Sequence, residues 1–189
     1  MAQNDVARVY AGSLFEIAKE KNMVPQVEEE LNIVVQILAE ETEFKSYINT
    51  PGITGEVKKS FINKVFAGNI SENTLNLLNL LIDNGRQESI SGIYEAFVEL
   101  DDIHNNRERI TVITQTSLGE SLIANIRSQI GKKLNKEIIV TEKVDESILG
   151  GIIIKIGDLV IDGSLAKGLK NIKSNLLNSK VRSEVAYED

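Results

Sequence analysis

The chain has 189 residues, 42% of them hydrophobic and 26% charged, with a formal net charge of −7. This composition is typical of a globular protein of one or two domains. The absence of cysteine excludes disulfides, thiolate metal sites and cysteine nucleophiles, and it favours a reducing compartment. No apolar stretch approaches the roughly 20 residues of a membrane-spanning helix. The N-terminus shows no signal-peptide pattern, so we expect none.

The charges are unevenly distributed along the chain. Residues 1–107 carry 9 basic and 17 acidic side chains, whereas residues 108–189 carry 12 and 11. An acidic surface repels phosphate, and no basic stripe is interleaved with the few aromatic residues. We therefore expect two parts of different kind and no binding to nucleic acid.

Residues 1–105 have helical periodicity throughout, which predicts an antiparallel bundle of six helices. Proline is favoured in a first turn, while Ser, Thr and Gly are favoured at helix ends. A short polar segment separates each helix from the next. The expected helix boundaries are, in chain order, Pro25, Thr50-Pro51-Gly52, Thr54, Gly68-Asn69, Ser71 and Asn84-Gly85.

The period changes after residue 109, where β-branched runs begin to alternate with helical segments. Ser117-Leu118-Gly119-Glu120 has the form of a capping box, Gly157-Asp158 that of a hairpin turn, and Ser164 that of a helix cap. We expect a three-stranded sheet, a final helix with Leu165 and Leu176 on one face, and a polar tail from Ser179. The predicted fold class is therefore α+β, with a helical domain at 1–105 and a small α/β domain at 106–189.

Few residues could support catalysis. The single histidine, His104, is predicted to lie in a polar linker, where no second ligand or nucleophile accompanies it. The segment Gly163 to Gly168 lacks the Lys-Ser/Thr of a phosphate loop. Asp158 and Asp162 are more typical of turns than of a catalytic carboxylate pair. We predict no catalytic residue, no metal and no cofactor.

Two helices have unusually wide apolar faces. The helix over Leu75 to Ile82 spreads its leucines over roughly 220° at about 100° per residue, and the first helix is similar. Small residues at Ala7, Ala11, Gly12 and Ser13 would let another backbone approach. Two interpretations stay open, because periodicity does not separate them: a groove for a partner helix, or burial by the chain's own helices.

Paired glycines mark a second feature, at the start of a strand. Gly150-Gly151 precedes the β-branched run, which predicts either a positive φ or a close approach to a neighbouring strand. Asp145 and Ser147 are expected to bond backbone N–H groups in the same turn. The residues assigned to this turn and strand junction are Gly150, Gly151, Gly157, Asp158, Asp162, Gly163 and Ser164.

Three segments together resemble the delta subunit of F-type ATP synthases, the family of the oligomycin-sensitivity conferral protein. They are Val6 to Ala11 with Leu14-Phe15, Leu80 to Arg86, and Val144 to Ile152 continuing into Ile156 to Ser164. The last segment combines paired glycines, a β-branched strand, a Gly-Asp turn and an Asp-Gly-Ser helix cap. The resemblance extends over the whole chain.

The resemblance implies a non-catalytic stator component that couples rotor torque to ATP synthesis and proton transport. It implies that residues 1–105 bind the N-terminal helix of an alpha subunit and residues 106–189 the b subunits. It also implies contacts with other ATP synthase subunits, and an indirect attachment to the cytoplasmic face of the plasma membrane. A free cytoplasmic adaptor for another amphipathic helix is the alternative. The implied alpha-subunit groove consists of Tyr10, Ser13, Leu14, Ile17, Asn76, Leu77, Leu80 and Leu81.

Overall fold

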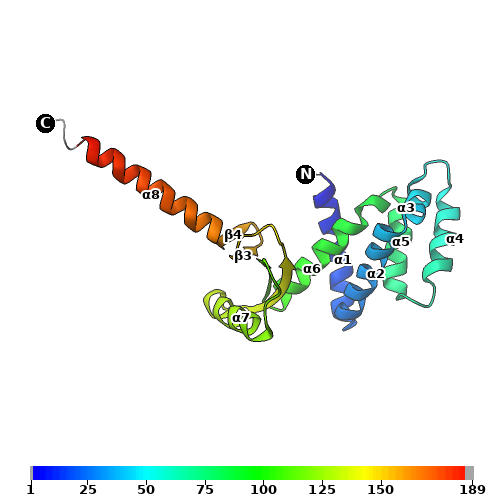
Figure 1. Cartoon of the computed structure of the whole chain (residues 1–189). Helices are drawn as coiled ribbons and strands as arrows, with labels where there is room; N and C mark the ends of the chain where they lie inside the picture. The colour runs from blue at the N-terminus through cyan, green and yellow to red at the C-terminus, as the bar shows by residue number, and fades with distance from the viewer. Residues whose placement is uncertain (1, 186–189) are drawn as a thin grey trace. The chain divides into compact units, whose positions relative to one another are not determined.

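The computed structural model describes residues 2–185, and the chain divides into two compact units, Met1–His104 and Asn105–Asp189. The N-terminal unit is helical and the C-terminal unit combines helices with a sheet (Figure 1), so the predicted α+β class is confirmed. The helices of the N-terminal unit are α1 (Ala2–Glu20), α2 (Val24–Glu40), α3 (Thr42–Asn49), α4 (Gly55–Phe66), α5 (Glu72–Asp83), the 3-10 helix η1 (Gln87–Ser89) and α6 (Ile90–His104). The C-terminal unit consists of β1 (Arg107–Thr114), α7 (Glu120–Leu134), β2 (Glu137–Val144), β3 (Gly151–Ile156), β4 (Leu159–Ser164) and α8 (Leu165–Val185).

Most predicted helix ends are found in the structure. Pro25 lies in the first turn of α2, and Gly85 adopts a positive φ of 63° after α5 and donates its N–H to the carbonyl of Ile82. Ser71 is the N-cap of α5, where its hydroxyl accepts a bond from the backbone N–H of Thr74. Thr54 also occupies an N-cap position, but its side chain makes no capping bond, so that part of the prediction is wrong.

The core of the N-terminal unit is centred on α6. Phe97 is fully buried, and its ring packs edge-on against that of Phe15 with centroids 5.5 Å apart. Small residues let α1 approach α6 closely, because a Cβ at Gly92 would lie 3.3 Å from the Cβ of Ala7. Ala11 is fully buried. Ala7 therefore accommodates the chain's own α6, whereas Gly12 and Ser13 do not lie in this contact.

This close approach makes Gly92 a test of packing. We expect Gly92→Leu to destabilise the N-terminal unit by about 1–2 kcal/mol, because the larger side chain forces α1 away from α6. Gly12→Leu is the matched control, since nothing lies within 4 Å of a Cβ at Gly12. Urea unfolding followed by circular dichroism measures the stability of both variants. Equal midpoints for the two variants would contradict the packing argument.

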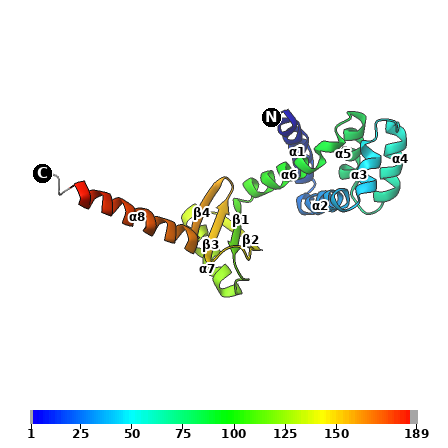
Figure 2. The same ribbon diagram turned by 45° about the horizontal axis from the view of Figure 1, so that its top comes forward.

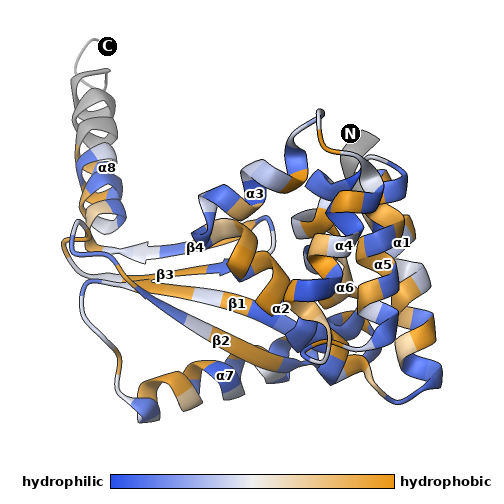
Figure 3. Ribbon diagram, turned by 90° about the vertical axis from the view of Figure 1, so that its right-hand side faces the viewer, coloured by the Kyte–Doolittle hydropathy of each residue, from blue (hydrophilic) through white to orange (hydrophobic). Residues whose placement is uncertain are grey.

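Four strands, and not the predicted three, form the sheet of the C-terminal unit. Their order is β2-β1-β3-β4, with β1 parallel to β2 and the other pairs antiparallel. The β-branched runs on either side of Gly157-Asp158 are separate strands joined by a two-residue turn, as Ile156 pairs with Leu159. Figure 3 shows the apolar character of β1 and β3. Their residues Ile110, Val112 and Ile154 belong to the core that α7 covers through Ile126 and Ile130.

The start of α7 differs from the predicted capping box. The N-cap is Gly119, which has no side chain with which to cap the helix. The hydroxyl of Ser117 instead donates to Oε2 of Glu142 at 3.1 Å, and the N–H of Leu118 donates to Oε1 of the same carboxylate. Glu142 on β2 therefore holds the loop before α7 against the sheet, a role for Ser117 that local spacing does not reveal.

Helix α8 follows β4 without a loop and extends away from the sheet (Figures 1 and 2). The hydroxyl of Ser164 accepts a bond from the N–H of Lys167 at 3.2 Å, which confirms the predicted cap. The helix continues to Val185, so the tail expected from Ser179 is helical as far as that residue, and residues 186–189 lie outside the described part. No helix between residues 2 and 185 has the length and apolarity needed to cross a membrane.

Candidate functional site: the α1–α5 face

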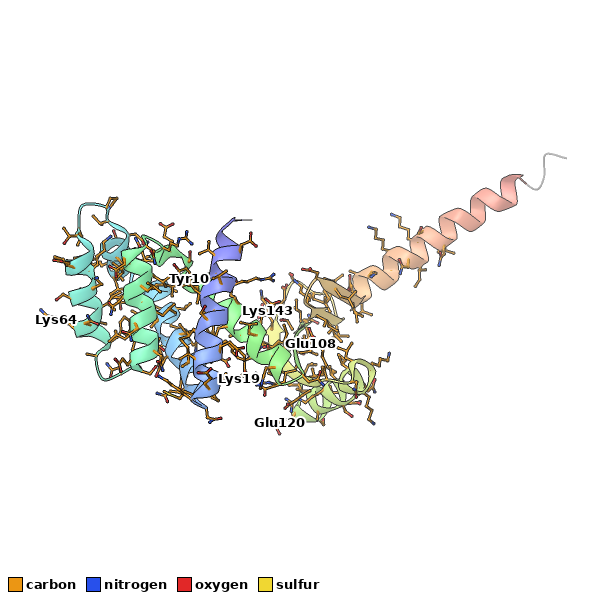
Figure 4. The ribbon with its side chains drawn as sticks, turned by 180° about the vertical axis from the view of Figure 1, so that it is seen from behind. Tyr10, Lys19, Lys64, Glu108, Glu120 and Lys143 are labelled. Atoms are coloured by element: carbon orange, nitrogen blue, oxygen red, sulfur yellow. The ribbon has the colours of Figure 1, made fainter. Side chains whose placement is uncertain are left out.

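Two polar bridges join α1 to α5. The amide Nδ2 of Asn84 donates to the hydroxyl of Tyr10 at 3.2 Å, and Nζ of Lys21 donates to Oδ1 of Asn73 at 3.0 Å. Tyr10 on α1 and Lys21, which directly follows α1, are eleven residues apart, as are Asn73 on α5 and its C-cap Asn84. The two helices are therefore antiparallel and in register over about 16 Å, at 1.5 Å per residue. Tyr10 is labelled on α1 in Figure 4.

Between these bridges each helix exposes one large apolar side chain. Ile17 is 42% exposed and Leu80 48% exposed. Each lies four residues before one bridging residue and seven after the other, so Ile17 and Leu80 occupy equivalent positions on the two helices. Together with the half-buried Tyr10 and the exposed Ser13 and Asn76, they form what we call the α1–α5 face. Five of the eight predicted groove residues are thus accessible on neighbouring helices.

The other three predicted groove residues require a correction. Leu14, Leu77 and Leu81 are only 4%, 7% and 0% exposed and belong to the core of the N-terminal unit. They support the face from beneath and present almost no surface to a partner. Most of the wide apolar arc of α5 is buried by the chain's own helices. Leu80 is the large apolar side chain of this arc that remains exposed.

The histidine prediction is also wrong in its location. His104 is the last residue of α6 and not part of a linker. Its ring lies edge-on to that of Phe15, with centroids 5.8 Å apart. His104 therefore contributes an aromatic contact at the end of α6.

A buried carboxylate that the sequence analysis missed holds the start of α5. Glu30 on α2 is 4% exposed and accepts bonds from the N–H of Ser71 at 2.8 Å, the Ser71 hydroxyl at 2.7 Å and the Thr74 hydroxyl at 2.5 Å. Gln26 donates a further bond to it at 2.9 Å. The available sequence signal is a glutamate on the same helical face as Val27 and Val34. Its partners Ser71 and Thr74, more than 40 residues away, cannot be found from local spacing.

The environment of Glu30 has opposing effects on its ionisation. Burial raises the pKa of the Glu30 carboxyl, but hydrogen bonds from Thr74, Ser71 and Gln26 outweigh burial and leave the pKa below its usual value of 4.5. The carboxylate also lies at the N-terminal end of α5, where the helix dipole favours a negative charge. Glu30 therefore acts as a cap that reaches α5 from another helix.

Two hollows lie elsewhere on the N-terminal unit. The larger, of about 770 Å³ and wide open, lies between α4 and α5 and is lined by Lys59 and Asn63 among others. The second, of about 460 Å³, is lined by residues including Leu38, Ile48 and Ile90. Neither is lined by a residue of the α1–α5 face. A partner at that face therefore meets helix surfaces and does not enter these hollows.

The glycine junction before β3 meets both parts of its prediction. Gly150 and Gly151 have φ values of 144° and 87°. A Cβ at Gly151 would lie 2.5 Å from the carbonyl oxygen of Gly163 on the paired strand, closer than any real contact allows. The Asp145 carboxylate accepts a bond from the N–H of Ser147 at 3.0 Å, as expected. The Ser147 hydroxyl donates to the same carboxylate at 2.6 Å and not to a backbone group, so the prediction for Ser147 is wrong.

The remaining turn residues have structural surroundings. Gly157 has a φ of 53° in the two-residue turn that it forms with Asp158, and Gly163 lies opposite Ile152 in the β3–β4 ladder. The Asp162 carboxylate accepts a bond from the N–H of Ser164 at 2.9 Å. This bond, with contributions from the Ser164 side chain and Lys167, lowers the pKa of Asp162. These residues shape the turn and the start of α8.

Comparison with known proteins decides the family. The sequence pattern of the family described as ATP synthase delta (OSCP) subunit matches residues 6–176. The chain belongs to this family. Among its delta-family relatives, ATP synthase subunit delta of Bacillus thuringiensis (strain Al Hakam) and that of Bacillus anthracis are each 38% identical over 181 residues. Each match covers 95% of this chain and 100% of the relative. The family predicted from the three sequence segments is confirmed.

Solved structures support the fold. A chain of the Toxoplasma gondii mitochondrial ATP synthase hexamer matches with a TM-score of 0.68 and 21% identity, over 90% of this chain and 97% of that chain. A chain of the Polytomella F-ATP synthase matches with a TM-score of 0.50 and 22% identity, over 52% of this chain and 87% of that chain. This chain therefore shares its fold over most of its length with a chain of the Toxoplasma gondii assembly.

Proposed function

We propose that this chain is the non-catalytic stator subunit that links the catalytic head of an F-type ATP synthase to its peripheral stalk. Its family membership and its full-length similarity to bacterial delta subunits support this role. In this role it holds the head stationary, so that rotor torque is coupled to ATP synthesis and proton transport. The Bacillus relatives support a peripheral position at the cytoplasmic face of the plasma membrane, reached through other subunits.

The N-terminal helical bundle, residues 1–105, binds the N-terminal helix of an alpha subunit at the α1–α5 face. The observation that carries this proposal is the pair of exposed apolar side chains, Ile17 and Leu80, held at equivalent positions by the two polar bridges. An amphipathic helix recognises its site through apolar anchors spaced along one face. A stator contact must also dissociate slowly under load, which favours apolar burial over screened surface ion pairs.

The C-terminal domain, residues 106–189, binds the b subunits. Helix α8 supports this assignment, because four of its large apolar side chains recur at four- and three-residue steps and are 57–62% exposed. They are Leu165, Leu169, Ile172 and Leu176. A stripe of this spacing fits the apolar face of another helix.

The alpha-subunit site is tested by Leu80→Asp. We expect the full chain carrying this substitution to bind a fluorescently labelled peptide of the alpha subunit's N-terminal helix at least tenfold more weakly, because a charge becomes desolvated in an apolar contact. Val57→Asp is the matched control, since Val57 lies on α4 of the same unit and is 49% exposed. Unchanged affinity of the Leu80→Asp variant would place the alpha-subunit site elsewhere.

Association with the whole complex separates the stator role from that of a free adaptor. We expect the chain to co-purify from native membranes with alpha and b subunits, identified by mass spectrometry. Recovery with a different helical partner and without the ATPase would favour the adaptor.

A further inference from the structure

The charges around the α1–α5 face are unequal at its two ends. At the Tyr10–Asn84 end, Asp83 is paired with Nζ of Lys59 at 2.7 Å, so its charge is balanced. At the Lys21–Asn73 end lie two exposed carboxylates, Glu20 on α1 and Glu72 on α5, which make no ion pair with any described residue. Two cations lie at that end: Lys21 is bonded to Asn73, and Lys19, two residues after Ile17, lies on the opposite side of α1.

Helix geometry directs both carboxylates toward the face. Glu20 lies three residues after Ile17 and so shares a side of α1 with that face residue. Glu72 lies four residues before Asn76 and shares a side of α5 with it. Because α1 and α5 are antiparallel, Glu20 near the end of α1 and Glu72 at the start of α5 flank the same bridge.

We propose that the helix bound at the α1–α5 face carries a lysine or arginine over the Lys21–Asn73 end. This inference rests on the proposed alpha-subunit site and adds the charge of its occupant. A basic side chain there would lie near the carboxylates of Glu20 and Glu72 and the single lysine of the bridge, whereas an acidic one would meet net repulsion. At the opposite end Asp83 and Lys59 neutralise each other and the exposed Arg86 follows Asn84, so a basic side chain is not favoured there.

The unequal charges at the two ends of the α1–α5 face favour one orientation of the bound helix, in addition to contributing to its affinity. Exposed ion pairs contribute little to affinity, and charge complementarity mainly selects the partner and its register. The apolar pair is nearly symmetric, since Ile17 and Leu80 hold equivalent positions on antiparallel helices. The carboxylates at one end distinguish the two orientations in which a helix could lie on that pair.

The test compares two charge-neutralised forms of the full chain by fluorescence anisotropy with the labelled alpha-subunit peptide. Glu20→Gln with Glu72→Gln removes two carboxylates beside the face, and Glu40→Gln with Glu43→Gln is a control with the same change of net charge at exposed positions elsewhere in the unit. We expect the first pair to weaken binding about three- to tenfold in about 0.1 M salt. We expect most of this difference to disappear in about 1 M salt, where the Debye length falls to about 3 Å. The control pair is expected to bind like the parent.

Two results would overturn the charge assignment while the binding site stands. In the first, Leu80→Asp abolishes binding but the Glu20→Gln/Glu72→Gln form binds like the parent at both salt concentrations. In the second, this form binds more tightly than the parent, which would mean that the bound helix places an acidic side chain at that end. If the parent does not bind the peptide, or Leu80→Asp leaves binding unchanged, the proposed site itself fails and the charge assignment with it.

Discussion

Gly151→Ala is expected to remove about 3 kcal/mol from the stability of the C-terminal unit, the upper part of the range for a strained backbone residue. Gly151 has a φ of 87°, which side chains other than glycine rarely adopt. Its Cβ would lie 2.5 Å from the Gly163 oxygen and 2.9 Å from the Cα of Ser164. Both are backbone atoms of the paired strand, so relief requires β3 and β4 to separate.

Gly168→Ala is the matched control for this substitution. Gly168 lies within α8, and nothing is within 4 Å of a Cβ placed there. In a helix interior alanine is favoured over glycine by about 1 kcal/mol, so this variant should not be destabilised. Gly150→Ala should lie between the two, because its Cβ would meet the side chain of Leu165, which can rotate away.

Hydrogen exchange at the backbone amides of the sheet measures the loss of stability within the C-terminal unit. We expect Gly151→Ala to lose protection in β3 and β4, to retain b subunits less well, and to bind the alpha-subunit peptide unchanged. Equal protection in the Gly151→Ala and Gly168→Ala variants would mean that the close approach in the β3–β4 pair is not maintained in solution.

The parts of the fold that could be predicted from the sequence have mostly local causes. The proline at the start of α2, the glycine after α5 and the Gly-Asp turn between β3 and β4 each act on their own neighbours, so a short window contains the whole cause. The pairing of β1 with β2 differs, because these strands are parallel and separated by α7. The predicted number of three strands was a miscount, because the hairpin turn expected at Gly157-Asp158 already implies two strands there in addition to the two earlier ones.

The candidate site could be predicted only in part, for a related reason. Helical spacing gives the direction in which a side chain points, but not what lies opposite. Leu80 and Leu81 both read as parts of one wide apolar arc, yet the first is 48% exposed and the second fully buried. The bridge from Lys21 to Asn73 joins residues 52 positions apart, and the spacing of either helix alone does not indicate it.

Glu30→Ala is expected to destabilise the N-terminal unit by about 3 kcal/mol at neutral pH. The substitution removes four hydrogen bonds to a charged group and leaves the hydroxyl of the fully buried Thr74 without its carboxylate acceptor. Bonds to charged groups contribute about 1.5–3 kcal/mol each, and a buried polar group without a partner costs about 1–3 kcal/mol. Burial of the carboxylate offsets part of this sum.

Glu29→Ala is the control, because Glu29 is the adjacent residue on α2 and is exposed. Urea unfolding gives the stability difference, and hydrogen exchange at the first amides of α5 shows where it arises. We expect those amides to lose protection in the Glu30→Ala variant only. If the two variants unfold at the same urea concentration, the carboxylate network makes no net contribution.

The difference between the parent and the Glu30→Ala variant is also expected to depend on pH. Because the pKa of Glu30 is lower in the folded chain than its usual 4.5, the folded state favours the ionised carboxylate. This part of the stability is fully present above about pH 4.5 and is lost as the pH falls through the lowered folded-state pKa. The variant has no carboxylate to protonate, so its deficit relative to the parent should be largest near pH 7 and shrink in acid. A deficit that stays constant over this range would assign the stabilising effect of Glu30 to the packing of its side chain and not to its charge.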